Sequence, residues 1–316
     1  MRAFTILIPH YKTKITAYCL HQIFKHSGNR VNVVVISNSG NEGLNYLEPY
    51  ADRITTIIYP SDRMQSHGLA FDYAIEQGLV KTDYFITLES DSYPTLDNWL
   101  EYYDNLIDEG YEMAASRLKL SGGEYYHPAG AMYRLDSWHQ CKEYVEKLND
   151  AYYYYPNFAL KEGFMCHVMM QKHTAVRPEA KDYLPIAHSV FHNGMGYNQE
   201  SYNTYGQRNT LTGVDDFLKK NSNDYMVYRM GYEPGQFFGY WHLATGKKVY
   251  SIPTEVTWMP NRTNQQQECT KTENGIIHIW GGTAMTLTSD ASVEDITRRK
   301  TELTEQLYNS IQNETN

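Results

Sequence analysis

The sequence predicts an α/β fold built on a mainly parallel sheet with helices on its faces. Over the first third of the chain, short apolar runs rich in β-branched residues alternate with stretches of helical spacing. This alternation is typical of parallel sheets, because each helix returns the chain to the edge where the next strand begins. The chain has 316 residues, 41% of them hydrophobic, which allows one large domain or two unequal ones with a substantial core.

Four strands are predicted in the first ninety residues, and turn-forming residues follow each of them. They are the apolar runs at residues 3–9, 32–37, 54–60 and 84–90. Helices are predicted between or after these strands at residues 14–27, 67–79 and 95–110. The first ends before Gly28, and Thr95 is a candidate N-cap for the third.

The rest of the chain is less regular. Two more strands are predicted at residues 111–120 and 130–135, and helices at 135–148 and 159–172. Residues 185–275 are rich in Gly, Asn, Tyr and Pro, which indicates loops, and a polar terminal helix is predicted at 291–311. We place a soft boundary near residue 180, between a core of residues 1–180 and a C-terminal part of residues 181–316, although one continuous domain is the alternative.

Composition excludes several classes of protein. The four cysteines are far apart and form no CxxC pair, which argues against a zinc knuckle or a disulfide framework and fits a reducing compartment. The chain opens on a strand-like run without a signal peptide, and no apolar run is long enough to span a bilayer, so we expect a cytoplasmic protein. The formal net charge of −9 disfavours tight non-specific binding to nucleic acid.

The segment "LESDS" carries the strongest candidate site. Glu89 and Asp91 come at the end of the fourth predicted strand, and alternate strand residues share one face. Two carboxylates so placed repel each other unless a cation lies between them, and oxygen ligands suit Mg²⁺ or Mn²⁺. In parallel sheets, ligands bind beyond the carboxyl ends of the strands. The alternative is an ordinary loop with solvated acidic side chains.

The order of motifs around this segment resembles that of the GT-A glycosyltransferases, especially the family-two-like branch, over residues 3–170. The matching segments are "ILIPHYK", "VVVISNSGNEG", "SHGLAFDYAI" and "LESDS". The resemblance implies a GT-A fold, a nucleotide-sugar donor, most simply a UDP-sugar, and a divalent metal on Glu89 and Asp91. Two departures are Asn38, where the family usually has Asp at the base-reading position, and Glu89, where the metal motif usually begins with Asp.

Further site residues follow from this alignment of motifs and from residue chemistry. The expected donor-binding residues are Pro9, Tyr11, Asn38, Arg63, His67 and Asp91, and those on the acceptor side are Gly130, Ala131 and Tyr197. Glu162 stands at the place of the catalytic base, although a first-turn glutamate stabilised by the helix dipole is the alternative. His278 is the candidate third metal ligand, or else a half-buried, hydrogen-bonded histidine.

The resemblance therefore implies a metal-dependent, inverting glycosyltransferase that moves a hexosyl or pentosyl group to a hydroxyl acceptor. The acceptor is either a glycan or glycoside, or a hydroxymethylated pyrimidine in DNA, as for viral enzymes of this kind that transfer glucose or arabinose. The 29 tyrosines offer flat faces on which a sugar or a base can stack. The rival functions are a nucleotidyltransferase of the same fold and a non-catalytic sugar- or nucleotide-binding module. Membrane binding is not expected, and the sequence leaves the oligomeric state open.

Overall fold

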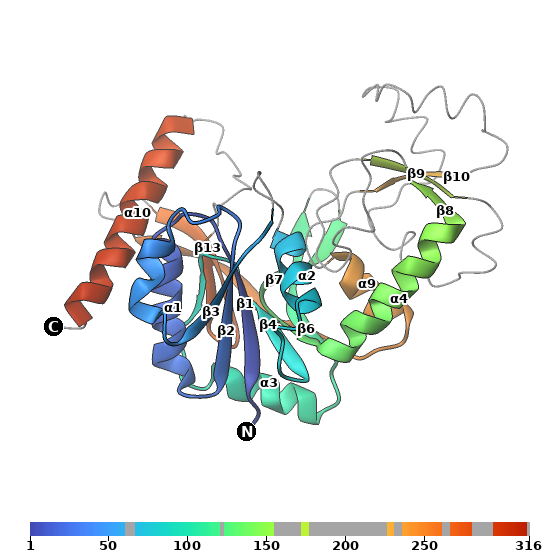
Figure 1. Ribbon diagram of the computed structural model, residues 1–316, viewed down its shortest axis with the longest axis horizontal. Coiled ribbons are helices and arrows are strands. Elements are labelled where there is room, and N and C mark those ends of the chain that lie inside the picture. Colours follow the sequence, from blue (N-terminus) through green and yellow to red (C-terminus); the bar gives the residue numbers. More distant parts are fainter. Residues whose placement is uncertain are drawn as a thin grey trace.

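The computed structural model describes residues 1–60, 67–120, 123–154, 172–176, 226–230, 236–260, 266–279 and 293–314. Its centre is a seven-stranded sheet of order β11-β6-β7-β4-β1-β2-β3 (Figure 1). These strands are β1 (Phe4–His10), β2 (Val31–Ser37), β3 (Ile54–Ile58), β4 (Tyr84–Thr87), β6 (Met113–Leu120), β7 (Gly123–Arg134) and β11 (Val249–Ile252). Neighbouring strands run parallel except on the two sides of β7. The predicted α/β fold with a mostly parallel sheet is confirmed.

Helices cover both faces of this sheet. One face carries α1 (Ile15–Ser27), the 3₁₀ helix η1 (Leu44–Tyr50) and α3 (Trp99–Asp108), and the other carries α2 (His67–Glu76), α4 (Leu135–Ala151) and α9 (Gln236–Ala244) (Figure 1). All residues of β1 are buried, as a central strand between two helical layers requires. Phe4, Ile6 and Ile8 alternate along β1 and pack in one cluster with Trp99 and Tyr103 of α3.

A smaller four-stranded sheet of order β12-β13-β14-β5 joins three strands of the C-terminal part of the chain to a short strand that follows β4. Its strands are β5 (Ser92–Pro94), β12 (Thr254–Pro260), β13 (Gln266–Thr272) and β14 (Ile276–Ile279). Helix α10 (Val293–Glu314) packs on α1, and a second apolar cluster joins Leu303 and Leu307 of α10 to Tyr93 and Ile279. A third sheet consists of β8 (Tyr152–Tyr154), β9 (Lys172–Val176) and β10 (Met226–Met230).

Several local predictions are corrected by the structure. Thr95 is not an N-cap, because α3 begins at Trp99, and the Thr95 hydroxyl donates instead to the carbonyl of Gly275 at 2.8 Å. The loop prediction for residues 185–275 is wrong in part, since α9 and strands β10 to β13 lie there. The terminal helix is confirmed as α10, whereas the helix predicted at 159–172 falls almost wholly outside the described residues.

The division near residue 180 also falls outside the described residues and remains a prediction. Beyond it, β11 pairs with β6 inside the main sheet, and β14 pairs with β5. Both halves of the chain therefore contribute strands to the same sheets. None of the helices in the described ranges combines the length and apolarity needed to cross a bilayer.

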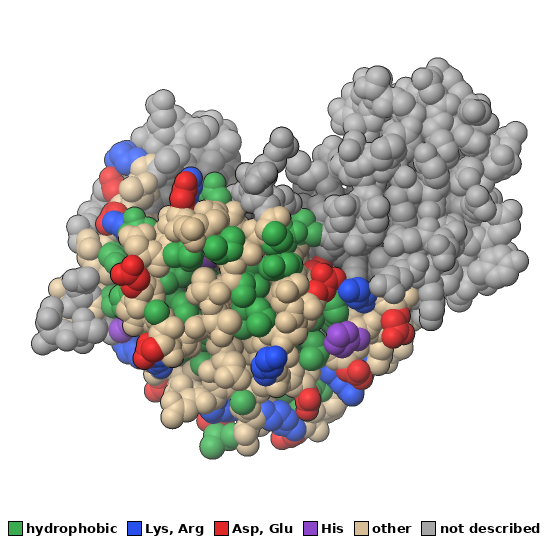
Figure 2. All heavy atoms as spheres, in the orientation of Figure 1, with side chains coloured by type: hydrophobic (Ala, Val, Ile, Leu, Met, Phe, Trp, Pro, Cys, Tyr) green, Lys and Arg blue, Asp and Glu red, His purple; other side chains and the backbone are tan. Residues whose placement is uncertain are grey.

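The described part of the face seen in Figure 2 carries mixed charge. Figure 2 shows acidic and basic side chains interspersed over one face, between hydrophobic and uncharged polar groups. This distribution differs from the continuous basic stripe that a phosphate backbone attracts.

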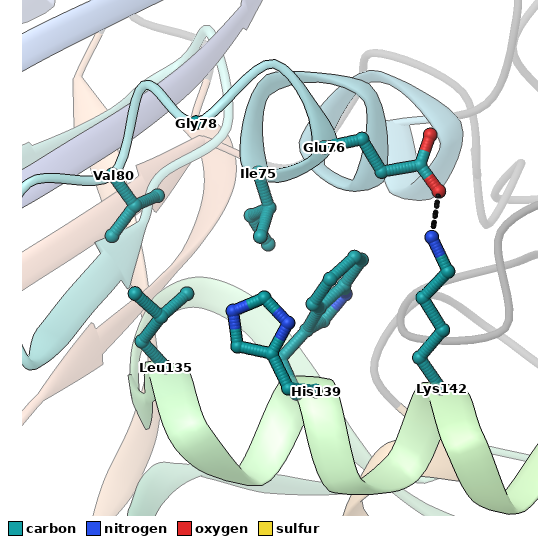
Figure 3. A pocket seen from close by; sticks show the side chains of 8 residues that line it. Ile75, Glu76, Gly78, Val80, Leu135, His139 and Lys142 are labelled. Carbon is teal, nitrogen blue, oxygen red and sulfur yellow. Dashed lines mark hydrogen bonds and ion pairs between the residues drawn. The ribbon is translucent and has the colours of Figure 1, made fainter.

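A pocket of about 610 Å³ lies between the end of α2 and the beginning of α4 (Figure 3). Ile75, Val80, Leu135 and Trp138 line it, and an ion pair of 2.9 Å joins Glu76 to Lys142 at one side. His67, at the other end of α2, is eight residues before Ile75 and therefore lies about 12 Å from this pocket along the helix axis. The pocket is thus a packing gap between two helices, separate from the acidic turn after β4.

Candidate metal-binding site at the carboxyl edge of the sheet

The two predicted acidic residues lie in a turn directly after β4. Leu88 still pairs with β1, since its N–H donates to the Leu7 carbonyl at 3.0 Å. The chain then turns, and the Ser92 N–H donates to the Glu89 carbonyl at 3.0 Å. Glu89 and Asp91 are therefore brought together by a turn, whereas the sequence predicted strand alternation as the cause. Both side chains are only 13% exposed.

His278 joins the acidic turn from a distant part of the chain. Strand β14 pairs with β5 so that His278 stands opposite Ser92, and the Ile279 N–H donates to the Asp91 carbonyl at 3.1 Å. This register places His278 Nε2 at 3.0 Å from Glu89 Oε2 and 3.5 Å from Asp91 Oδ1. One buried imidazole nitrogen thus faces both carboxylates.

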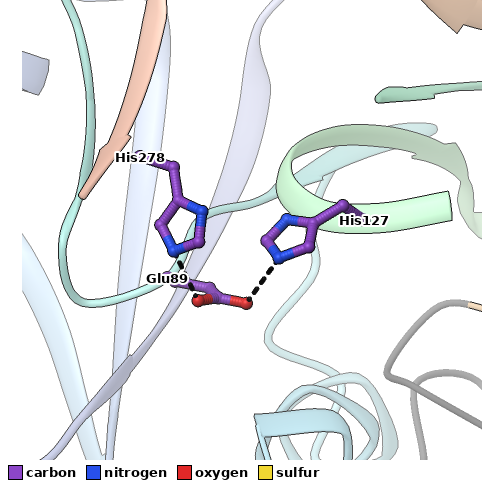
Figure 4. Close-up of side chains that lie close together, drawn as sticks. All are labelled: Glu89, His127 and His278. Atoms are coloured by element: carbon purple, nitrogen blue, oxygen red, sulfur yellow. Dashed lines mark ion pairs between the residues drawn. The ribbon is translucent and has the colours of Figure 1, made fainter. Parts of the chain in front are cut away.

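Two more histidines approach the other oxygen of Glu89. His127 Nε2, from β7, and His67 Nδ1, from the start of α2, each lie 3.7 Å from Glu89 Oε1. Figure 4 shows the carboxylate between the rings of His127 and His278, whose centroids are 4.8 Å apart. We call Glu89, Asp91, His67, His127 and His278 the histidine–carboxylate cluster.

A large bulge in β7 aims His127 at Glu89. In the pairing of β6 with β7, Ala114 faces Met132 while Ser116 faces His127, so residues 128–131 of β7 stand opposite one residue of β6. Gly130 in this bulge has a φ of 79°, which favours glycine. The Thr87 hydroxyl fixes the bulge by donating to the Pro128 carbonyl at 2.6 Å.

The electrostatics of the cluster are strongly coupled. Burial raises the pKa of Asp91 to about 6, and the charge of Glu89 adds to this effect. Burial alone would lower the pKa of His278, but the carboxylates of Glu89 and Asp91 raise it to about 9. Burial would likewise raise the pKa of Glu89, but His278 holds it well below its usual range. Burial lowers the pKa of His127 to about 3. Without a metal ion, the carboxylates thus depend on protonated imidazole for positive charge.

The donor set fits a divalent metal ion. Ligand atoms of Glu89, His127 and His278 all lie within 4.8 Å of one another. Two atoms bound about 2.1 Å from one ion lie about 3.0 to 4.2 Å apart. The distances of 3.0 and 3.5 Å from His278 Nε2 to the two carboxylates are within that range. Carboxylate and imidazole together suit Mn²⁺ and its neighbours in the first transition row.

The residues predicted to bind the donor lie at the same edge of the sheet where the structure describes them. Pro9 is buried near the end of β1, and Tyr11, just beyond it, is 40% exposed. Asn38, after β2, is buried, and its N–H donates to the His10 carbonyl at 2.8 Å. His67 belongs to the cluster. Arg63, Glu162 and Tyr197 lie outside the described residues, so their roles remain predictions.

The predicted acceptor-side pair has a packing role in the structure. A Cβ on Gly130 would lie 3.1 Å from the side chain of Ile276, so the glycine allows β7 to approach β14. Ala131 is fully buried and pairs with Thr87 in the sheet. Contact of either residue with an acceptor remains a prediction.

His127 is the member of the cluster that the sequence reasoning missed. The sequence predicts a role for Gly130 and Ala131, whereas His127, three residues before Gly130, is the residue that approaches Glu89. The available signal is a histidine followed by Pro-Ala-Gly just before the strand predicted at residues 130–135, because proline and glycine in a strand indicate a bulge.

Comparisons with known proteins give only distant structural matches. No protein-family model matches the chain, and neither does any curated protein sequence. Among solved structures, S. aureus TarS 1–349 in complex with UDP-GlcNAc is 17% identical over 52% of this chain and 51% of that one, with a TM-score of 0.35. The mannosyltransferase PcManGT from Pyrobaculum calidifontis, in complex with GDP-Man and Mn²⁺, is 12% identical over 52% and 50%, with a TM-score of 0.36. The chain thus spans about half the length of these proteins.

Proposed function

We propose that the protein is a metal-dependent glycosyltransferase of the GT-A type, which takes its sugar from a nucleotide-sugar. The observation that carries this proposal is the meeting of Glu89, Asp91 and His278 just beyond the carboxyl end of β4. That edge of a parallel sheet is where ligands of α/β proteins bind. The same three residues are those that the resemblance to GT-A enzymes assigns to the metal.

The chain would hold the metal ion through Glu89, Asp91 and His278. When bound, such an ion neutralises the negative charge that develops on a diphosphate leaving group. The protein's part is to hold the three side chains ready: they are almost fully buried, on a turn and a strand that hydrogen-bond to each other. Preorganised groups of this kind need little rearrangement during the reaction.

The donor nucleotide would lie over the ends of β1 and β2, where Tyr11 and Asn38 stand. Tyr11 is exposed enough to stack on a base, and the buried Asn38 is held against the β1 backbone, which limits its movement. A uracil edge presents both a donor and an acceptor, and an amide can pair with both. A UDP-sugar is therefore the first donor to test.

We propose Glu162 as the base that takes the proton from the acceptor hydroxyl, which gives inversion at the anomeric carbon. Replacing it with Gln keeps the size of the side chain and removes the basic oxygen. We expect Glu162→Gln to abolish transfer while leaving metal-dependent donor binding intact. A variant that still transfers sugar at the wild-type rate contradicts this assignment without affecting the metal site.

The acceptor is proposed to be a glycan or glycoside, with a hydroxymethylated pyrimidine in DNA as the more specific alternative. The net charge of −9 and the mixed charge in Figure 2 favour the glycoside. Retention on DNA-cellulose at low salt, lost steeply as salt rises, would favour the DNA base. Absence of retention at low salt would remove the DNA alternative.

The function is tested by thermal unfolding with a panel of UDP- and GDP-sugars, in Mn²⁺ and in chelator. A ligand at a hundred times its dissociation constant adds about 2.7 kcal/mol to the free energy of unfolding. We expect this stabilisation for one donor, only with metal, and not in Asp91→Ala; the matched control Asp52→Ala changes an exposed aspartate and should behave like wild type. If no donor stabilises the protein under either condition, the proposal is wrong.

A further inference from the structure

The position of His127 and its hydrogen bonding point to different roles. Its Nε2 is close enough to Glu89 and His278 for all three residues to be taken as metal ligands. Its other ring nitrogen, however, accepts a hydrogen bond, because the backbone N–H of Ala129 donates to His127 Nδ1 at 3.1 Å. This bond is buried, so it fixes which nitrogen carries the proton.

A neutral imidazole has one N–H and one lone pair in the ring plane. Because Nδ1 uses its lone pair on the Ala129 N–H, the proton of neutral His127 must be on Nε2. A protonated nitrogen cannot bind a metal ion. His127 therefore points an N–H, and not a lone pair, at Glu89 Oε1.

The local sequence holds this tautomer in place. Pro128 has no N–H, so Ala129 supplies the first backbone donor after the histidine. The Thr87 hydroxyl donates to the Pro128 carbonyl at 2.6 Å, and Ala131 pairs with Thr87 across the strands. The Ala129 N–H is thereby fixed relative to His127, and flipping the ring would leave this buried donor without its acceptor.

We propose that His127 is a positioning residue that orients Glu89 and is not itself a metal ligand. At 3.7 Å, its Nε2–H is a small movement away from a hydrogen bond to Glu89 Oε1. That bond leaves Oε2, the oxygen 3.0 Å from His278 Nε2, for the ion. Among the three residues whose ligand atoms lie within 4.8 Å of one another, His278 is then the one imidazole that binds the metal, and His127 acts through the carboxylate. This inference rests on the proposed metal site.

Two substitutions separate positioning from ligation. In His127→Gln the amide nitrogen can take the place of Nε2 and still donate to Glu89. In His127→Asn the amide oxygen can replace Nδ1 as acceptor for Ala129, but the side chain is too short to reach Glu89. Loss of an outer-shell partner typically weakens metal affinity by about 10- to 100-fold. We expect a dissociation constant for Mn²⁺ about tenfold weaker in His127→Asn and within about threefold of wild type in His127→Gln.

The ligand count is measured directly by pulsed electron paramagnetic resonance on the full chain loaded with Mn²⁺. We expect one directly bound ¹⁴N in wild type and in both His127 variants, and none in His278→Gln. Two bound nitrogens in wild type, falling to one in His127→Gln, would overturn the proposal. Equal Mn²⁺ affinity in wild type and His127→Asn would also overturn it, since the histidine would then be structural only.

The experiments also distinguish failure of the proposed glycosyltransferase function from failure of the proposed role of His127. A wild-type protein that binds Mn²⁺ through one nitrogen but is not stabilised by any nucleotide-sugar would contradict the glycosyltransferase and leave the role of His127 standing. A wild-type protein that binds no Mn²⁺ would overturn both. The melting temperatures of the His127 variants in chelator check that the bulge still folds. We expect His127→Asn, which keeps an acceptor for the Ala129 N–H, to melt close to wild type, and His127→Gln, which lacks one, to melt lower but still cooperatively.

Discussion

Replacing Asp91 with Asn should stabilise the metal-free protein and prevent its stabilisation by metal. Burial raises the pKa of Asp91 from 3.8 to about 6, so the ionised carboxylate disfavours the native state at neutral pH. A change of this size corresponds to at most about 3 kcal/mol. Asn has nearly the same shape and no charge. We therefore expect Asp91→Asn in chelator at pH 7.5 to melt up to about 6 °C higher than wild type.

The sign of the pH dependence follows from the direction of this shift. Because folding raises the pKa of Asp91, the native state binds that proton more tightly than the unfolded chain. Wild type should regain stability relative to Asp91→Asn as the pH falls from about 6 towards 3.8. The difference in free energy of unfolding between Asp91→Asn and wild type should thus be largest above pH 6 and absent below about pH 4.

Addition of Mn²⁺ should make wild type more stable than Asp91→Asn. At a thousand times its dissociation constant, a ligand adds about 4.1 kcal/mol to the free energy of unfolding, which exceeds the gain from the substitution. Differential scanning calorimetry in chelator and in Mn²⁺ measures both effects, with Asp52→Asn as the exposed control. If Asp91→Asn melts below wild type in chelator, the buried charge of Asp91 does not destabilise the native state. If Asp91→Asn gains as much stability from Mn²⁺ as wild type does, Asp91 is not a metal ligand.

Three further predictions concern the packing of the fold and can be followed by urea denaturation in chelator. Leu303→Ala opens the apolar cluster that packs against β14 and should lower the free energy of unfolding by about 2 to 4 kcal/mol. The control Leu243→Ala, at a side chain 46% exposed, should lower it by less than about 0.5 kcal/mol. Equal losses would mean that α10 does not pack against Tyr93 and Ile279. Gly130→Ala combines a positive φ with a Cβ 3.1 Å from Ile276, so it should cost at least about 1 kcal/mol more than Gly40→Ala, where φ is also positive but the space is open. Burial lowers the pKa of His242 to about 4, so wild type should lose up to about 3 kcal/mol relative to His242→Gln as the pH falls from about 6.5 to 4; parallel pH profiles would show that His242 is not buried in neutral form.

The regular part of the fold was predictable because its signals are local. Apolar runs bounded by turn residues predicted β1 to β4, and helical spacing with Gly28 at its end predicted α1. These patterns depend on neighbours a few residues apart. The boundary of α3 failed for the opposite reason: the Thr95 hydroxyl is bonded to Gly275, which is 180 residues away, and no local pattern shows this.

The candidate site was predictable only in part, since its members come from four separate segments. Glu89 and Asp91 are a pair close in sequence, and His278 is predicted as the third metal ligand. The pairing of β14 with β5, which brings His278 to the acidic turn, is a long-range contact that the sequence does not show. His127 depends on a β-bulge, and a bulge changes the alternation on which strand predictions rest.

Glu89 shows why side-chain length matters at this site. The sequence comparison treated a glutamate at the first acidic position as a departure from the aspartate usual there. In the structure, its carboxylate stands between His278 and His127, which come from separate strands, with one oxygen facing each ring. An aspartate would end one carbon–carbon bond, or about 1.5 Å, short of this position, so its oxygens would be too far from at least one imidazole. The bulge that carries His127 and the longer acid that meets it therefore belong to one arrangement. Shortening Glu89 to Asp, or replacing His127 with a residue too short to reach Glu89, should weaken the metal site.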